Sequence, residues 1–328
     1  MIAEAVERGD LDELTRLVEA LCSNRQWDDL LVMRDLCMRA LERGKQLWPA
    51  AHFAEYRLAL EATPEVAARV LVEGSGAFAL GPISEVAAST HTWKSLAPHI
   101  PSGAVGALTA HERVVRGEDL SGVVLVPDVL ELPLRLAPWE PRYALAAYRS
   151  DGADFPAAPI PRLEPIALRA VSSDISLVGD RSAERARRGL LDLAQAWSVG
   201  SDGRAEAVAV AGSAFDAIAA LGVRDARVAR CDGADAVAHM AWTAASGGAF
   251  GRRRGAATGR LDAWLAVGAL GGLGDVWPLP VEEMGEVLDR LSWYHWDANE
   301  PVTGWSLRIA VHDPATNRAW SIAAVDAR

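Results

Sequence analysis

The segment from residue 247 to residue 260 carries the side chains of this sequence that are best suited to binding an anion. It holds four arginines and five glycines in fourteen residues of a chain whose net charge is -11. Guanidinium groups bind phosphate or carboxylate in bidentate fashion, and glycines let the backbone approach a ligand closely. A helix that starts near Thr258 would also direct its first N–H groups toward such an anion. The predicted phosphate or nucleotide cradle consists of Gly248, Gly251, Arg252, Arg253, Arg254, Thr258 and Arg260.

The same segment also fits two other interpretations. It lacks the lysine of G-x-x-x-x-G-K-[ST], and its glycines do not follow the G-x-G-x-x-G order of a dinucleotide-binding turn. It can therefore be a helix–helix connection whose arginines pair with acidic residues of the N-terminal half of the chain. Local nucleic-acid binding by these arginines is the third interpretation, which the net charge of -11 disfavours.

Aromatic side chains gather near the C-terminal end, in a chain with twelve tryptophans. Trp293 and Trp296 would share a face if the preceding expected helix continued through them. His295 between them could act as a general base if a carboxylate lay close to it. A histidine among aromatic residues is more often a packed core residue, and tryptophans are more often core or interface anchors. We therefore treat Trp293, His295 and Trp296 as candidate interface residues rather than catalytic ones.

The remaining polar candidates form no catalytic or metal-binding set. Ser213 follows an expected strand and opens an expected helix, but it lacks the flanking glycine of G-x-S-x-G, so we predict a helix N-cap. His91, His99 and His111 match no metal-ligand spacing. The three cysteines form no C-x-x-C pair. We expect no catalytic residue, no metal and no cofactor.

Composition predicts a soluble cytoplasmic protein without a membrane segment. Half of the residues are apolar, which is enough to build the cores of two ordinary domains. The first residues are acidic and amphipathic rather than basic and then apolar, so they do not resemble a signal peptide. The longest weakly polar run, from Leu261 to Leu273, contains Asp262 and several glycines and is too short to span a bilayer.

The N-terminal third is predicted to consist of short helices. From residue 10 to about residue 117 apolar residues recur at helical spacing, as Leu14, Val18 and Leu21 do. Short helices with short connections pack as antiparallel neighbours, which gives a solenoid-like stack of helical hairpins without a fixed repeat. Such a stack either offers a groove to another protein or supports the neighbouring domain.

The expected secondary structure changes at a proline-rich stretch, after which strands and helices both occur. Eight of the seventeen prolines lie between Pro127 and Pro165, where short strands are expected at Val123–Val126 and Ala144–Tyr148. From Ile166–Val171 onward, strands alternate with helices, which predicts a partly parallel sheet, and the chain ends in a hairpin between Leu307 and Val325.

These patterns predict an α/β or α+β fold in three parts. The parts are an all-α helical-hairpin domain at 1–120, a proline-rich connection with short strands at 121–165, and a mixed α/β domain at 166–328 that ends in a β-hairpin.

The C-terminal third resembles a family of proteins from high-GC bacteria that has no assigned activity. The resemblance implies that the arginine–glycine segment and the terminal hairpin belong to one recurrent module, and it leaves the N-terminal helices outside. The stretches that carry it are Gly247–Arg260, Asp262-Ala263-Trp264, Gly304-Trp305-Ser306-Leu307, Asp313-Pro314, Ala319-Trp320 and Asp326.

We therefore predict a non-enzymatic interaction or adaptor protein. Its partner would be another protein, and it could also hold a small phosphate-containing molecule. The first alternative is a nucleotide- or phosphate-binding enzyme that uses residues 247–260, and the second is local nucleic-acid binding by the same arginines.

Overall fold

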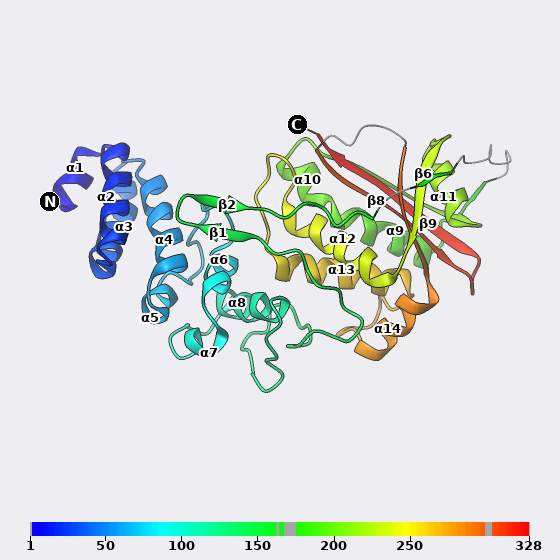
Figure 1. The fold of residues 1–328 in the computed structure, drawn as a ribbon, viewed down its shortest axis with the longest axis horizontal. Helices are drawn as coiled ribbons and strands as arrows, with labels where there is room; N and C mark the ends of the chain where they lie inside the picture. Colours follow the sequence, from blue (N-terminus) through cyan, green and yellow to red (C-terminus); the bar gives the residue numbers. More distant parts are fainter. Residues whose placement is uncertain (1, 162–163, 167–174, 299–303, 328) are drawn as a thin grey trace. The chain divides into compact units, whose positions relative to one another are not determined.

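The computed structural model describes residues 2–161, 164–166, 175–298 and 304–327, and the chain forms two compact units (Figure 1). The helical unit comprises Met1–Leu130 and Leu145–Phe155, and the sheet unit comprises Glu131–Ala144 and Pro156–Arg328. The proline-rich segment therefore contributes to both units, because the chain passes from one to the other at residues 130, 144 and 155.

The helical unit is a stack of short helices, as predicted. Local sequence determines where several of them begin: the Asp10 side chain accepts from the amides of Asp12 and Glu13, and Pro49 occupies the first turn of its helix. The helices are α1 (Ile2–Arg8), α2 (Leu11–Ser23), α3 (Trp27–Glu42), α4 (Trp48–Glu61), α5 (Pro64–Ala68), α6 (Ile83–Thr90), α7 (Trp93–Leu96) and α8 (Ala104–Val115).

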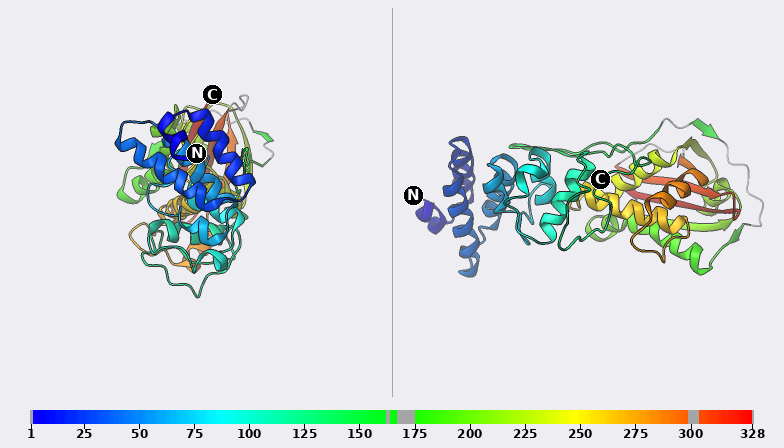
Figure 2. Two further views of the ribbon diagram at one scale, coloured as in Figure 1. Left: turned by 90° about the vertical axis from the view of Figure 1, so that its left-hand side faces the viewer. Right: turned by 90° about the horizontal axis from the view of Figure 1, so that it is seen from below.

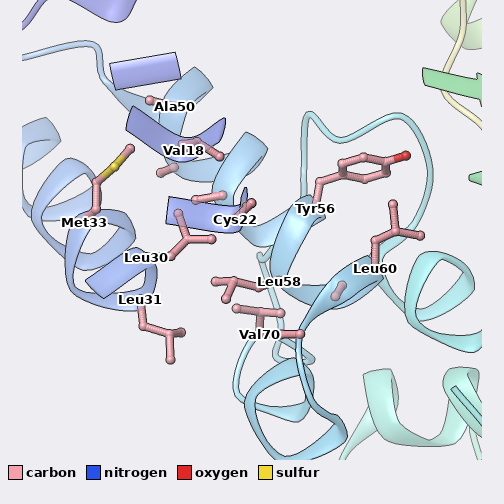
Figure 3. Close-up of a cluster of buried hydrophobic side chains, with 14 of the residues drawn as sticks. Val18, Cys22, Leu30, Leu31, Met33, Ala50, Tyr56, Leu58, Leu60 and Val70 are labelled. Atoms are coloured by element: carbon pink, nitrogen blue, oxygen red, sulfur yellow. The ribbon is translucent and has the colours of Figure 1, made fainter. Parts of the chain in front are cut away.

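Helix α4 is the centre of this unit and is buried on nearly every side. Its small residues Ala50, Ala51 and Ala54 let α2, α3 and α6 approach closely. Apolar side chains of α2, α3 and α4 gather into one core (Figure 3). Because neighbouring helices cover α4 on nearly every side, the packing of the stack depends on this helix.

Of the two strands predicted in the proline-rich stretch, one is present in part, and the prediction of the other is wrong. Strand β1 (Ala147–Arg149) overlaps the expected strand at Ala144–Tyr148 and pairs antiparallel with β2 (Gly152–Asp154). Val123–Val126 is not a strand, because no described strand lies beside it to complete its backbone hydrogen bonds.

The sheet unit contains a seven-stranded sheet in the order β3-β6-β7-β8-β9-β5-β4. The predicted helices, the C-terminal hairpin and the combination of helices with strands in one domain are confirmed. Residues 167–171 of the strand expected at Ile166–Val171 lie outside the described residues. The elements are β3 (Glu164–Ile166), β4 (Ser176–Leu177), α9 (Arg181–Leu193), α10 (Gln195–Gly200), β5 (Arg204–Ala211), α11 (Ala214–Ala220), β6 (Ala226–Cys231), α12 (Gly233–Ser246), α13 (Ala256–Leu270), α14 (Val281–Arg290), β7 (Ser292–Asp297), β8 (Trp305–Asp313) and β9 (Arg318–Asp326).

The prediction of a partly parallel sheet is wrong. Every described strand pair is antiparallel. The segment β5-α11-β6 looks like a parallel crossover unit in sequence, but β7, β8 and β9 lie between β5 and β6 in the sheet. The three C-terminal strands thus separate two strands that are neighbours along the chain.

Helices cover both faces of this sheet (Figure 2). Helix α11 packs on one face through Ala214 and Ile218, which contact Trp296 and Ala310. Helices α9 and α12 pack on the other face, where the Trp320 indole donates to the carbonyl of Ala183. In the described part of the chain, no helix has the length and apolar character needed to cross a membrane.

Candidate functional site

The arginine–glycine segment is a tight loop between α12 and α13, and it folds against its own unit. Gly248 has a φ of 86°, and a Cβ there would lie 2.2 Å from Oδ2 of Asp326. A Cβ on Gly251 would lie 2.0 Å from the carbonyl oxygen of Gly247. The Ala249 amide donates to the buried Asp326 carboxylate at 2.6 Å. The glycines therefore permit close backbone packing, and the carboxylate at this loop is the chain's own Asp326.

The predicted binding arginines differ in burial and surroundings. Arg254 donates to Asp262 at 2.6 Å, while Arg252 is exposed and Arg253 is buried. Helix α13 begins at Ala256, capped by Gly255, so Thr258 is half-buried in its first turn rather than at its start. For Arg254 the geometry favours the interpretation of a helix–helix connection stabilised by ion pairs.

Arg260 is fully buried in a bidentate ion pair with Glu140. Its Nε lies 2.7 Å from Oε2 and its Nη2 lies 2.8 Å from Oε1 of that carboxylate. Two more donors reach the carbonyls of Pro133 and Arg135. Burial alone would raise the pKa of Glu140, but the hydrogen bonds and charge of Arg260 outweigh burial and lower it. Arg260 therefore anchors residues 131–144 to α13.

The candidate interface residues Trp293, His295 and Trp296 are buried in strand β7. Their exposed fractions are 1%, 1% and 3%. Because β7 is a strand and not a continued helix, Trp293 and Trp296 point to opposite faces of the sheet. All three are core residues of the sheet unit, so they do not offer a docking surface.

His295 meets a second histidine that the sequence did not single out. Nδ1 of His295 lies 3.2 Å from Nδ1 of His239 on α12, and the rings stack with centroids 5.1 Å apart. Nε2 of His239 donates to the carbonyl of Ser306, so its Nδ1 is an acceptor and Nδ1 of His295 donates to it. Nε2 of His295 is buried without a hydrogen-bond partner. The pair is neutral and structural, and it makes no hydrogen bond to a carboxylate in the described part of the chain.

A surface groove in the helical unit is the stronger candidate site. It has a volume of about 460 Å³ and is lined by residues of α4, of the loop before α6 and of the β1–β2 turn. Its apolar lining includes Trp48, Phe53, Tyr56, Phe78 and Leu80. Phe78 and Leu80 are about half exposed, at 52% and 48%. A hollow of this size with a largely aromatic lining and half-exposed apolar side chains is typical of a binding site.

A hydrogen bond and an aromatic packing contact hold the walls of this groove in place. The Tyr56 hydroxyl donates to the carbonyl of Arg149 at 2.6 Å, which fixes the β1–β2 turn against α4. The Phe78 ring packs on Trp48, with ring centroids 4.1 Å apart, and on His52. The aromatic wall is therefore assembled on the most buried helix of the unit and is preorganised for binding.

The buried carboxylate of Glu55 connects this helix to the loop that carries Phe78. It accepts from the amide of Gly76 at 2.6 Å, from Nδ1 of His52 at 2.9 Å and from Nε of Arg34 at 2.7 Å. The Glu55 side chain has no solvent exposure, so water cannot replace these bonds.

Replacing Glu55 by alanine should destabilise the helical unit by about 2 kcal/mol, because it leaves buried donors unsatisfied. The loop around Gly76 should also lose its attachment to α4. Hydrogen exchange of α4 and of residues 74–80 in increasing urea measures both effects. Glu42→Ala removes an exposed carboxylate from α3 and is the matched control. Equal exchange in the two variants would contradict the role of Glu55.

The comparisons with known proteins place nearly the whole chain in one family. Residues 10–328 match a family of unknown function, DUF6183. The chain belongs to DUF6183. The match includes the helical unit, so the expectation that only the C-terminal third belongs to such a family is corrected. No curated protein and no solved structure matches the chain significantly. Membership of DUF6183 assigns no activity to either unit.

The groove could not be predicted from the sequence because its residues are far apart in the chain. They come from positions 19, 48–56, 78–80 and 150–152. One local signal was present: Phe78 and Leu80 lie among glycines in the segment from Gly74 to Gly81, where no buried helix face is expected. Apolar side chains at such positions are exposed unless a partner covers them.

Proposed function

We propose that this DUF6183 protein is a non-enzymatic interaction protein, and that its helical unit binds a segment of a partner protein in the groove at Trp48, Tyr56 and Phe78. The observation that carries the proposal is that this hollow is lined by aromatic side chains and that one of them, Phe78, is about half exposed. Tryptophan, tyrosine and phenylalanine supply much of the binding energy at protein interfaces, because they bury a large rigid area at a small entropic cost.

The chemistry of the described residues favours this function over the alternatives. The amide of Ala249 in the arginine–glycine loop is taken by Asp326, and Arg254 and Arg260 are paired with carboxylates. A phosphate-binding enzyme that used this loop would need those groups for its ligand. A small anionic ligand is for this reason not part of the proposal.

We place this function in the cytoplasm. Cys22 and Cys37 are free buried thiols of the helical unit, and burial raises the pKa of each to about 11. Two unpaired thiols in one small unit are typical of a reducing compartment.

Photocrosslinking from the groove tests the proposal. With p-benzoylphenylalanine at position 78 of the full chain, in cells that produce the protein, we expect a discrete covalent adduct with a partner. The same group at position 32 on α3 should give none, because Val32 is also about half exposed but does not line the groove. Trp48→Ala in the chain that carries the crosslinker should reduce the adduct about tenfold or more, as loss of an interface anchor does.

Two outcomes would reject this function. Equal labelling from positions 78 and 32 would show collisional rather than specific contact. An adduct that persists unchanged in the Trp48→Ala chain would show that the aromatic wall does not bind the partner.

A further inference from the structure

The rim of the aromatic groove is acidic. Glu19 of α2 and Asp151 of the β1–β2 turn are both exposed and both line it. Among its lining residues, all of which belong to the described part of the chain, none is basic. The groove thus combines an apolar aromatic wall with carboxylates at its edge.

The rim charge is not neutralised within the helical unit. Glu19 makes no ion pair with any described residue, and the guanidinium of Arg57, which interacts with its charge, is paired with Glu61. Asp151 lies 3.4 Å from Nε of Arg149, but that guanidinium also pairs with Asp154. Two carboxylates therefore share one positive charge, and a net negative charge remains beside the aromatic wall.

The aromatic wall is itself suited to a cation. The negative face of an aromatic ring attracts ammonium and guanidinium groups, and tryptophan does so most strongly. The helical unit already contains one such contact, because the guanidinium carbon of Arg57 lies 5.7 Å from the centroid of the Phe53 ring. The half-exposed ring of Phe78, packed against Trp48, offers a further surface of the same kind.

Resting on the interaction function proposed above, we infer that the groove binds a basic–apolar peptide segment. An arginine or lysine of this segment lies over the wall formed by Trp48 and Phe78, with its charge directed to Glu19 and Asp151. A neighbouring apolar side chain of the segment packs on Leu80. An acidic or phosphorylated segment would meet the rim carboxylates and be repelled.

Fluorescence anisotropy with defined peptide pools tests this inference on the full chain. The first pool consists of labelled octapeptides with a central aromatic residue flanked by arginine or lysine. In the second pool glutamate replaces the basic residues, and in the third alanine replaces the aromatic residue. We expect the first pool to bind, the third to bind more weakly and the second not to bind. Added salt should weaken the binding of the first pool.

Charge variants test whether the carboxylates at the rim of the groove attract the basic residues of the peptide. Glu19→Gln and Asp151→Asn should each weaken binding of the first pool by about three- to tenfold, as expected for removing one partly exposed charge from an interface. Glu42→Gln removes an exposed carboxylate that does not line the groove, and it should leave binding unchanged.

The outcomes separate this inference from the proposed function. Equal binding of the basic and acidic pools, or rim variants that behave like Glu42→Gln, would overturn the inference and leave the groove as a peptide site. If no pool binds while crosslinking at position 78 succeeds, the basic chemistry is wrong and the interaction function stands. If both experiments fail, both proposals fail.

Discussion

Replacing Arg260 by alanine should lower the free energy of unfolding of the sheet unit by about 3 to 5 kcal/mol, because it leaves the buried charge of Glu140 without its partner. Both side chains of this pair have no solvent exposure. Glu140 would keep hydrogen bonds from Tyr143, Trp264 and the amide of Ala137, which are too few to replace a bidentate guanidinium. The loss should therefore approach the whole cost of an uncompensated buried carboxylate.

Urea denaturation followed by tryptophan fluorescence measures this loss. Nine of the twelve tryptophans belong to the sheet unit, so the signal reports mainly on it. Arg254→Ala is the matched control: this arginine is 35% exposed in its pair with Asp262, and its removal should cost about 1 kcal/mol or less. Similar losses in the two variants would contradict the special role of the buried pair.

A double replacement tests whether the buried charge is the cause. Arg260→Leu with Glu140→Leu removes both charges and keeps apolar volume, so it should be more stable than Arg260→Leu alone.

The same variants should show which part of the sheet unit the buried pair holds in place. The guanidinium also lies 5.5 Å from the ring of Trp264, which packs on Trp139, so hydrogen exchange should rise first in residues 131–144. Uniform loss of protection across the sheet unit would argue against a local anchor.

The helices of the helical unit could be predicted because their signals are local. The spacing of Leu14, Val18 and Leu21 defines one face, and all three residues are buried. The capping box at Ser213 was equally local, and the structure confirms this serine as an N-cap. Signals of this kind need no knowledge of distant partners.

The sheet could not be predicted to the same depth because strand pairing is a long-range property. Ala207 of β5 faces Ile322 of β9, more than a hundred positions away in the chain. The alternation of strands and helices from β5 to α12 suggested parallel neighbours, but it contains no information about where the C-terminal strands insert.

The residue types of the arginine–glycine segment predict binding to an anion but do not identify that anion. Arg254 and Arg260 do bind carboxylates, but those carboxylates belong to Asp262 and Glu140. Arginine has the same geometry toward an internal carboxylate and toward a ligand, so composition alone cannot distinguish the two.

The sheet unit should lose about 4 kcal/mol of stability between pH 7 and pH 5 through its buried histidine pair, since each imidazole contributes up to about 1.4 kcal/mol per pH unit. Burial and the nearby charge of His295 lower the pKa of His239 to about 3, and burial lowers the pKa of His295 to about 4. In the unfolded chain both titrate near the ordinary value of 6.5. Between that value and about 4 the unfolded state binds more protons, so stability falls as the pH falls.

The pair can be tested by changing one imidazole while keeping its hydrogen bond. In His295→Gln the side-chain amide can still donate to Nδ1 of His239, so the fold should persist and the slope of stability against pH should fall by about half. Urea midpoints between pH 7 and pH 5, followed by tryptophan fluorescence, measure that slope. His99→Gln removes an exposed histidine of the helical unit and should leave the slope unchanged. An unchanged slope in His295→Gln would contradict this prediction, because it would mean that His295 binds protons equally well in the folded and unfolded states.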